Sequence, residues 1–431
     1  MNKIIRMTIN RQLWTLMILL NAGYLFAQDS LKLTLSDCYK KAIENHPLSR
    51  QNDLYRQASV LQLSNLDKNH LPQVNINGQA SYQSAVTNIP IRIPGINVPT
   101  LPLDQYKLSL DLNQLIYDGG LLKFQKELEK NNLLINQQNT EIELFTIKER
   151  INQVYFAILL TDENLDLLSN TKKDLETRRK TLESGVQNGV MLRSNVDILQ
   201  SEILNVNQKI IEAQYQREGL INILSELLST PLPQAVHLQT PGISMTTLNQ
   251  KINRPEYLLF DIQKQGLDVS KKMSGLKTIP RVSGFGTMGY GQPGLDMFKD
   301  GFAFYYMIGA RVSWNLWNWN QTNQELRIAD LKKNIVENQY EAFDKNIKAQ
   351  AWQYESDISK VRSLIASDDE LIKLRENISR SAASQLEHGV ITSTEYLTEF
   401  DREIQAKLSQ KLHKVQLVQA QANLMATYGN F

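Results

Sequence analysis

The most constraining feature of this sequence is a stretch of 62 residues, 121–182, that contains no proline or glycine. Its apolar side chains recur at alternating spacings of three and four residues over more than five heptads, which is typical of a coiled-coil seam. The seam positions are Leu144, Ile147, Ile151, Val154, Ile158, Thr161, Leu165, Leu168, Lys172, Leu175, Arg179 and Leu182. Such a helix would extend about 93 Å at 1.5 Å per residue. It cannot bury its own apolar stripe, so the chain must supply partner helices of similar length.

Residues 1–27 have the pattern of a cleaved signal peptide. Lys3, Arg6 and Arg11 precede the apolar run 13–20, and Ala27 is a small residue at the expected cleavage point. The apolar run is too short to span a bilayer as a stable helix. The first residues of the mature chain would therefore be the polar Gln28, Asp29 and Ser30.

The single cysteine, Cys38, limits both anchoring and disulfide chemistry. A lipid anchor would need a cysteine directly after the cleavage point, and Cys38 lies about ten residues further on. We interpret it as a small buried side chain. One cysteine allows no intrachain disulfide, which favours a bacterial periplasm or outer membrane over an animal secretory route.

Composition argues against two broad classes of function. The 47 basic and 45 acidic residues are interspersed and leave a net charge of +2, whereas a nucleic-acid binder concentrates basic residues on one face. The five histidines have no metal-ligand spacing, and we find neither a phosphate-binding glycine loop nor a nucleophile motif. We therefore expect no enzymatic activity, no cofactor and no metal site.

Two segments after the first helical pattern alternate in polarity with period two. Residues 73–84 place Val74, Ile76 and Tyr82 on one face and amide or hydroxyl side chains on the other, and residues 106–113 repeat the pattern beyond the loop prolines Pro90, Pro94, Pro99 and Pro102. An antiparallel hairpin on a soluble core is one interpretation. The uniformly polar face favours the other, strands of a transmembrane β-barrel with an apolar outside and a wet lumen.

The whole pattern occurs twice. Pro72, Val74, Gly78 and Tyr82 return 208 residues later as Pro280, Val282, Gly286 and Tyr290, and residues 112–120 match 312–320 with a displacement of 200. The second copy predicts strands at 281–291 and 301–317; the aromatic residues of the latter are typical of a lipid interface. A second long helix follows, with its seam at Ala351, Tyr354, Ile358, Val361, Ile365, Asp368, Ile372, Arg375, Ser379, Ala382 and Leu386.

Each long helix ends at a short turn, 185–190 or 388–391, after which a shorter helix returns. The first returning helix has its own seam from Val196 to Leu227. Together with a helix at 36–67 it adds up to roughly the length of the long helix, so two short helices should lie antiparallel to each long one. We therefore predict a first repeat at 28–229, an irregular proline-rich belt at mid-height at 230–253, and a second repeat at 254–431.

The order and duplication of these elements, with the strand exit Tyr117-Asp118-Gly119-Gly120 and the glycine turns, resemble the TolC-like outer-membrane efflux proteins over nearly the whole mature chain. The second exit departs from the family pattern, reading Trp317-Asn318-Trp319-Asn320. The resemblance implies an α+β membrane protein. A homotrimer would contribute four strands per subunit to a 12-stranded outer-membrane β-barrel, continued by a long periplasmic α-helical coiled-coil barrel. Four strands cannot close a barrel, whereas twelve leave room for a wet lumen.

The resemblance also implies a function and partners. The chain would be the passive outer-membrane duct of a tripartite efflux or secretion system, lying in outer-membrane lipid and driven by an inner-membrane transporter through a periplasmic adaptor (membrane fusion protein), with no role for nucleic acid. The alternative is a periplasmic coiled-coil adaptor or structural protein without a channel. An adaptor would show one hairpin flanked by small β domains instead of two hairpins flanked by barrel strands. The sequence does not distinguish drugs, metals, dyes, proteins or glycolipids as cargo.

Three groups of residues are candidates for the working surfaces of such a channel. The wet strand face would be lumen-facing; for the turns, helix termination alone is the alternative explanation of the glycines. The resemblance implies acidic rings a fixed distance beyond the second turn, where Glu395 is the sixth residue after Gly389 and the first repeat has Asn195 and Ile198 at the matching spacings. We expect one acidic ring; the alternative is that Glu395 is a solvated residue in a first helical turn, where acids are favoured. The lumen-facing strand residues are Asn75, Asn77, Gln79, Lys107, Asp111 and Arg311; the periplasmic tip and adaptor contact is Gly185, Gly189, Val190, Gly389 and Val390; the pore constriction is Glu395, Thr398 and Glu399.

Overall fold

The computed structural model describes residues 32–86, 101–243, 252–296, 299 and 301–431. The predicted signal peptide, the loop prolines Pro90, Pro94 and Pro99, and residues 244–251 of the predicted belt lie outside the described residues. The chain divides into two compact units. Unit 1 takes residues up to 49, 143–253 and 347–431, and unit 2 takes 50–142 and 254–346, so each unit draws on both predicted repeats.

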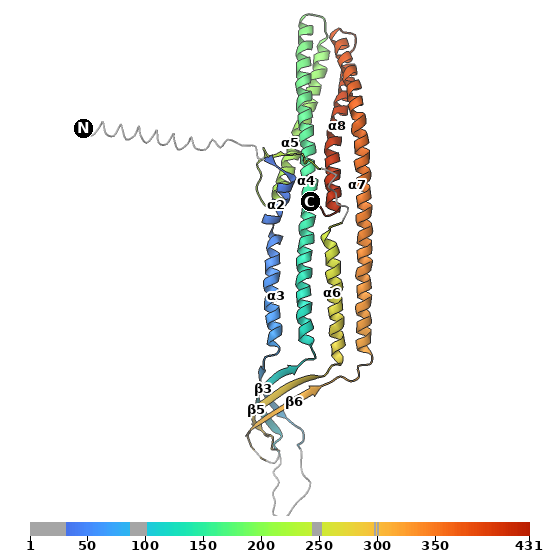
Figure 1. Cartoon of the computed structure of the whole chain (residues 1–431). Helices are drawn as coiled ribbons and strands as arrows, with labels where there is room; N and C mark the ends of the chain where they lie inside the picture. The colour runs from blue at the N-terminus through green and yellow to red at the C-terminus, as the bar shows by residue number, and fades with distance from the viewer. Residues whose placement is uncertain (1–31, 87–100, 244–251, 297–298, 300) are drawn as a thin grey trace, which may run out of the picture. The chain divides into compact units, whose positions relative to one another are not determined.

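The long helices and the helices that return from them occur twice, with a constant displacement (Figure 1). The long helices α4 (Leu121–Gln187) and α7 (Gln321–Glu387) each have 67 residues and start 200 residues apart. The returning helices α5 (Arg193–Leu227) and α8 (Ser393–Thr427) each have 35 residues and show the same displacement. The duplication read from the sequence is therefore present in both helix hairpins down to the residue.

Unit 2 contains a four-stranded antiparallel sheet in the order β2-β3-β5-β6. The helices α3 and α6 and the first parts of α4 and α7 belong to the same unit. In unit 2 the elements are α3 (Gln51–Lys68), β2 (Gln73–Tyr82), β3 (Asp104–Tyr117), α6 (Pro255–Gly275), β5 (Arg281–Gln292) and β6 (Ala303–Ser313).

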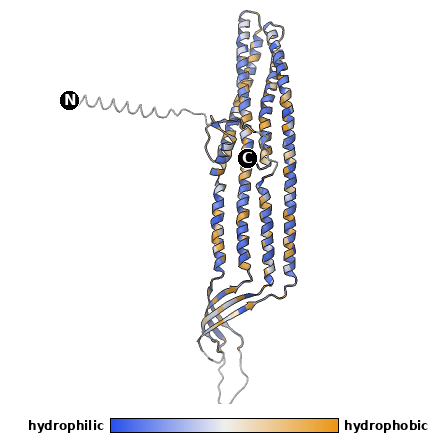
Figure 2. Ribbon diagram, in the orientation of Figure 1, coloured by the Kyte–Doolittle hydropathy of each residue, from blue (hydrophilic) through white to orange (hydrophobic). Residues whose placement is uncertain are grey.

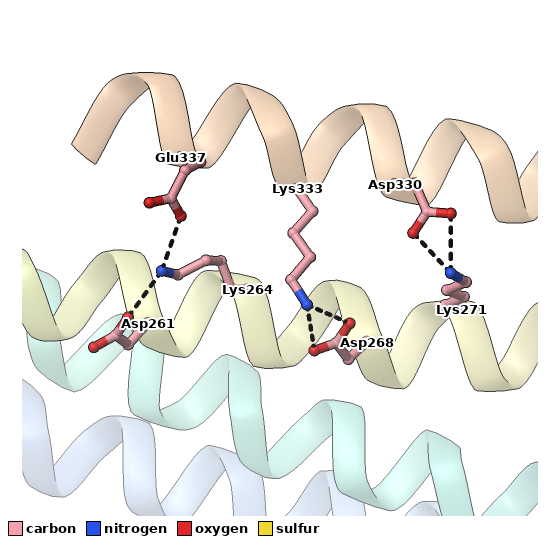
Figure 3. Close-up of polar contacts among 7 residues, drawn as sticks. All are labelled: Asp261, Lys264, Asp268, Lys271, Asp330, Lys333 and Glu337. Carbon is pink, nitrogen blue, oxygen red and sulfur yellow. Dashed lines mark hydrogen bonds and ion pairs between the residues drawn. The ribbon is translucent and has the colours of Figure 1, made fainter. Parts of the chain in front are cut away.

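Salt bridges join α6 to α7 within unit 2 (Figure 3). Lys264 lies 3.1 Å from Asp261 on its own helix and 3.2 Å from Glu337 on α7. The direction of the pairs then alternates along the helices, because Lys333 of α7 binds Asp268 of α6 and Lys271 of α6 binds Asp330 of α7. These partly exposed pairs fix the register of the two helices more than they add stability.

Unit 1 contains the two helix hairpins and a buried cluster near the start of the described chain. The predicted seams are buried or partly buried along both long helices, with Ile151, Ile158 and Leu386 completely inaccessible. Figure 2 shows why: apolar and hydrophilic residues alternate along every helix, so each has only a stripe to bury. The remaining elements are β1 (Lys32–Leu33), α2 (Leu35–Asn45) and β4 (His237–Leu238).

Part of the predicted belt is ordered by hydrogen bonds instead of being irregular. Strand β4 pairs in parallel with β1, and the buried Tyr155 of α4 donates from its hydroxyl to the carbonyl oxygens of Leu33 and Gln239. Arg217 of α5 binds the carbonyl oxygens of Gln234 and Val236. Two side chains of the coiled coil, Tyr155 and Arg217, therefore hold the belt in place. The sequence of the belt itself does not indicate these contacts.

The predicted single helix at 36–67 is wrong, because the chain is interrupted after Asn45. Pro47 begins a short 3-10 helix, Pro47–Arg50, before α3 starts. A proline has no backbone N–H for the helical ladder, and its ring excludes the residue before it from helical conformation. Cys38 lies in α2 and is buried as expected; burial raises the pKa of its thiol to about 12.

The predicted strand 301–317 is too long, since β6 ends at Ser313. The indole of Trp314 donates to the carbonyl oxygen of Thr278 at 2.9 Å instead of continuing the face of the strand. Beyond it, Trp319 and Asn320 have φ of 52° and 65°, where the first repeat has Gly119 and Gly120 at 73° and 89°. The second strand exit therefore keeps the left-handed backbone of the first, although it has no glycine. The bulky side chain of Trp319 makes this conformation strained.

Candidate functional site

Strand register places all six predicted lumen residues on one face of the sheet. Directly paired residues share a face, and the pairs Asn75 with Asp111 and Gln79 with Lys107 link β2 to β3. Asp111 pairs with Thr287 of β5, and Ser283 of β5 pairs with Arg311 of β6. Asn77 lies between Asn75 and Gln79 on the same face. That this face lines a lumen stays a prediction at this point.

The opposite face of the sheet is apolar and open. Ile76, Tyr306 and Ile308 are 74%, 66% and 81% exposed, values found for solvent-facing polar residues in a soluble protein. Leu108, Leu110, Leu112, Met288, Tyr290, Phe304 and Val312 extend the same surface. A sheet with one polar and one exposed apolar face is what a membrane-embedded barrel wall requires.

A hydrogen-bond network on the polar face is centred on Asp111. Its carboxylate accepts from Thr287 Oγ1 at 2.6 Å, from Asn77 Nδ2 at 2.6 Å and from Ser109 Oγ at 3.0 Å. The donors come from β2, β3 and β5, so this one side chain connects three strands. Ser109 and Thr287 were not among the predicted residues, although their position in the alternation would have identified them.

Two aromatic rings on the polar face lie against glycines of the neighbouring strand. A Cβ at Gly289 would come within 2.4 Å of the Tyr305 ring, and one at Gly309 within 2.7 Å of Phe285. Each ring makes a cation–π contact. Lys107 Nζ lies 5.2 Å from the centroid of the Tyr305 ring, and the Arg311 guanidinium lies 5.3 Å from that of Phe285. These glycines are therefore required by ring packing, and the rings position the two cations.

The glycine turns at the hairpin tips have the same geometry in both repeats. Gly189 and Gly389 have φ of 72° and 68°. Val190 N donates to Gly185 O and Val390 N to Gln385 O, at 3.0 and 2.8 Å, which with the adjacent glycine bonds completes a Schellman motif. Helix termination is thus sufficient to explain Gly189 and Gly389.

Gly185 has a local packing role, and its predicted contact with the adaptor stays a prediction. It lies inside α4, and a Cβ there would come within 2.9 Å of Met191 Cγ. Its small size accommodates a side chain of its own turn. Val190 and Val390, by contrast, are 72% and 71% exposed, and with Leu192 they leave an apolar surface at the tips.

Glu395 forms a capping box at the start of α8. Its carboxylate accepts from the backbone N–H of Thr392 at 2.8 Å, and the Thr392 hydroxyl accepts from Glu395 N at 3.3 Å. The Thr392 backbone N–H contributes most to holding the pKa of Glu395 below its ordinary value, and the Thr392 hydroxyl contributes next. The carboxylate is therefore fixed in place and charged; its local role in the first turn is the alternative explanation that the sequence left open.

The structure brings the three predicted constriction residues together. Glu395, Thr398 and Glu399 line one pocket of about 630 Å³ beside α7. Glu399 is paired with Arg375 at 3.3 Å and Arg402 at 2.5 Å, and the Thr398 hydroxyl donates back to Thr394 O. In the described structure Glu395 is the acidic member of this pocket without a cationic partner.

A buried acid and histidine in the second hairpin escaped sequence reasoning. Asp368 occupies a seam position of α7, and His413 Nδ1 of α8 lies 2.6 Å from its Oδ2. The carboxylate can only accept, so Nδ1 carries the proton. With the displacement of 200, the corresponding residues of the first hairpin are Leu168 and Ala213, both buried. The sequence did contain a signal for this pair, because Asp368 is a charged residue at a position of an apolar seam.

The two hairpins also pack against each other near their tips. Tyr396 and Phe400 of α8 belong to the same buried cluster as Leu182 and Leu199 of the first hairpin. The buried Ser393 donates from its hydroxyl to Asn195 O at 3.3 Å. Asn195, which replaces an acid at the matching spacing, is thus used as a contact between the hairpins.

No helix among the described residues is long and apolar enough to cross a membrane.

The sequence and the fold were each compared with known proteins. The family model described as "Outer membrane efflux protein" matches residues 38–229. No curated protein sequence matches the chain significantly. Among solved structures, the outer membrane protein VceC of Vibrio cholerae covers 92% of this chain and 96% of its own at 13% identity, with a TM-score of 0.68.

Two further structures have similar scores. The CmeC outer membrane channel of Campylobacter jejuni covers 92% of this chain and 85% of its own at 16% identity, with a TM-score of 0.65. The open state of the MtrE outer membrane channel of Neisseria gonorrhoeae covers 92% and 89% at 16% identity, with a TM-score of 0.64. At these identities the likeness establishes the fold, and the predicted fold class is confirmed.

Proposed function

Because residues 38–229 match the outer membrane efflux protein family model and the chain has the fold of solved outer-membrane channels, we propose that it is a member of this family and the exit duct of a tripartite efflux system. Three copies close a 12-stranded barrel in the outer membrane, and their helices continue it into the periplasm. An inner-membrane transporter drives transport through a periplasmic adaptor. The duct itself performs no chemistry.

The observation that carries this proposal is the sheet of unit 2. It has a polar face, an exposed apolar face and two edge strands, β2 and β6, that are unpaired on their outer sides in the described chain. Four strands cannot close, and a lipid-exposed edge is not tolerated, so further copies must supply the neighbours. An adaptor without a channel would not need such a sheet, and the two hairpins flanked by strands also disfavour that alternative.

A charge placed on either face of β6 tests the proposal. Ile308→Lys puts an ammonium on the apolar face and should cost about 2 to 4 kcal/mol per chain near the bilayer centre, so the yield of trimer should collapse. Met307→Lys, one residue away on the polar face, should assemble normally. The measurement is the mass of detergent-extracted protein.

Native protein should give three chains per particle. A stable, soluble native monomer, or equal trimer yields from the two lysine variants, would contradict the proposed barrel.

The exposed tips support a second part of the proposal, contact with the adaptor. Val190 and Val390 present apolar side chains on tight turns at the ends of both hairpins, where a partner's helices can approach closely. A photoreactive residue at either position should crosslink to the purified adaptor in the assembled pump. The same residue at the exposed Leu258 of α6 is the matched control and should not.

Capture of no adaptor from either tip position would remove the tips from the interface. The proposal leaves the cargo open, since the transporter selects what enters.

Glu395 carries the third part, a constriction formed by one acidic ring. Three-fold symmetry would bring three such carboxylates around one axis, where they repel each other and concentrate cations. The carboxylate of Glu395 is hydrogen-bonded to Thr392 but is not paired with a cation among the described residues, whereas that of Glu399 is ion-paired, which supports one ring instead of two.

A further inference from the structure

The polar face of the sheet has an unequal number of positive and negative side chains. In the described strands it carries three cations, Lys107, Arg281 and Arg311, against one carboxylate, Asp111. The apolar face has only Asp104, at the start of β3. Each chain therefore contributes a net charge of two positive units to the polar face, and three chains would contribute six.

The cations are held in place but not neutralised. Lys107 and Arg311 lie over the rings of Tyr305 and Phe285, which are themselves fixed over Gly289 and Gly309. Neither cation has a carboxylate within salt-bridge distance in the described structure. A ring positions a cation without cancelling its charge, so both remain able to bind an anion.

Asp111 offsets only one of the three positive charges. Its two carboxylate oxygens are already occupied by three neutral donors from the sheet. It lies four residues from Lys107 along β3, and the charges of the two side chains interact. Asp111 therefore weakens the positive field near Lys107, but two positive charges per chain remain in excess on this face.

We propose that the interior of the barrel is an anion-binding section of the channel, which takes solutes or cargo carrying several negative groups. This inference rests on the proposed trimeric barrel with its polar face inward. Inside low-dielectric walls the excess positive charge is focused on the aqueous lumen, so multivalent anions concentrate there and multivalent cations are excluded. Lys107 is near the start of β3 and Arg311 near the end of β6, so an anion meets positive charge toward both ends of the sheet.

Block of single channels by a multivalent anion tests the proposal. Inorganic tripolyphosphate, added from the barrel side of native protein in a planar bilayer at 0.1 M salt, should reduce the current. The double variant Lys107→Gln with Arg311→Gln should need about tenfold more tripolyphosphate for the same block, because two of three attractive charges per chain are gone. At about 1 M salt the Debye length is about 3 Å, so the difference should disappear.

Asp111→Asn provides a control of opposite sign, since it removes the only carboxylate of the face and should strengthen the block. Equal block of native and double-variant channels at low salt, or weaker block in Asp111→Asn, overturns the anion-binding section. A native protein that forms no channel overturns the proposed function instead. Normal conductance of the double variant at high salt shows that its barrel is intact.

Discussion

His413→Ala should increase the exchange rates of the α7 and α8 amides around Asp368 by a factor of about 10² to 10⁴, measured by hydrogen exchange on the assembled protein. The Asp368 side chain is only 7% exposed and its recorded partner is His413. Removing the imidazole leaves a buried carboxylate unpaired, which costs about 3 to 5 kcal/mol. Local opening of the hairpin then relieves that penalty, because it returns the carboxylate to water.

The first hairpin supplies the matched rescue. Asp368→Leu combined with His413→Ala reproduces the buried pair Leu168 and Ala213, and it should restore exchange to the native rate or slower. Lys414→Ala, at the exposed neighbour of His413, controls for side-chain truncation on α8. If His413→Ala exchanges as slowly as native protein, the pair does not stabilise the hairpin.

Glu395→Gln should lower the preference of the channel for cations over anions by about tenfold, measured as the shift of reversal potential in a salt gradient. Glutamine retains the hydrogen-bonding shape that a capping box needs at this position, so the change removes charge while keeping α8 in place. Thr392→Ala is the complementary control. It breaks the capping box and loosens the start of α8 but leaves the carboxylate, so selectivity should be retained.

The pH dependence of the same channel follows from the direction of the pKa. The Thr392 donors depress the pKa of Glu395, so its charge, and any stability that the charge contributes, is present above the ordinary carboxyl value of about 4.3. Both are lost only as pH falls through the depressed pKa. Selectivity should therefore be constant from pH 7 to about 5.

If the Glu395→Gln channel has the same selectivity as native protein, Glu395 does not belong to the constriction, and its role is to cap α8.

The elements that could be predicted are those whose periodicity is long. The seam of α4 repeats often enough that Lys172 and Arg179, unfavourable individually, do not obscure it. The alternation in β2 and β3 fixed which residues share a face, including Asp111 and Lys107. Duplication strengthened both, because each pattern recurs after 200 to 208 residues and the two copies support each other.

The missed features depend on single residues or on distant partners. Pro47 alone interrupts the predicted helix 36–67, and Trp314 leaves the strand because Thr278 offers an acceptor. The belt is ordered by Tyr155, more than eighty residues from Gln239. Near the tip, the spacing from Gly389 located Glu395. It did not show that Arg375 and Arg402 form salt bridges with Glu399. Such contacts arise only once separate helices are packed together.

The open edges of the sheet have a consequence for biogenesis. Hairpins such as α7 with α8 form from segments close in the sequence and can fold in a single chain, whereas β2 and β6 find partners only on other copies. Completion of the barrel is therefore a collision-limited step whose rate rises with chain concentration. Until it occurs, two strand edges can pair with any other extended chain. The time a new subunit waits for its partners thus sets its risk of aggregation.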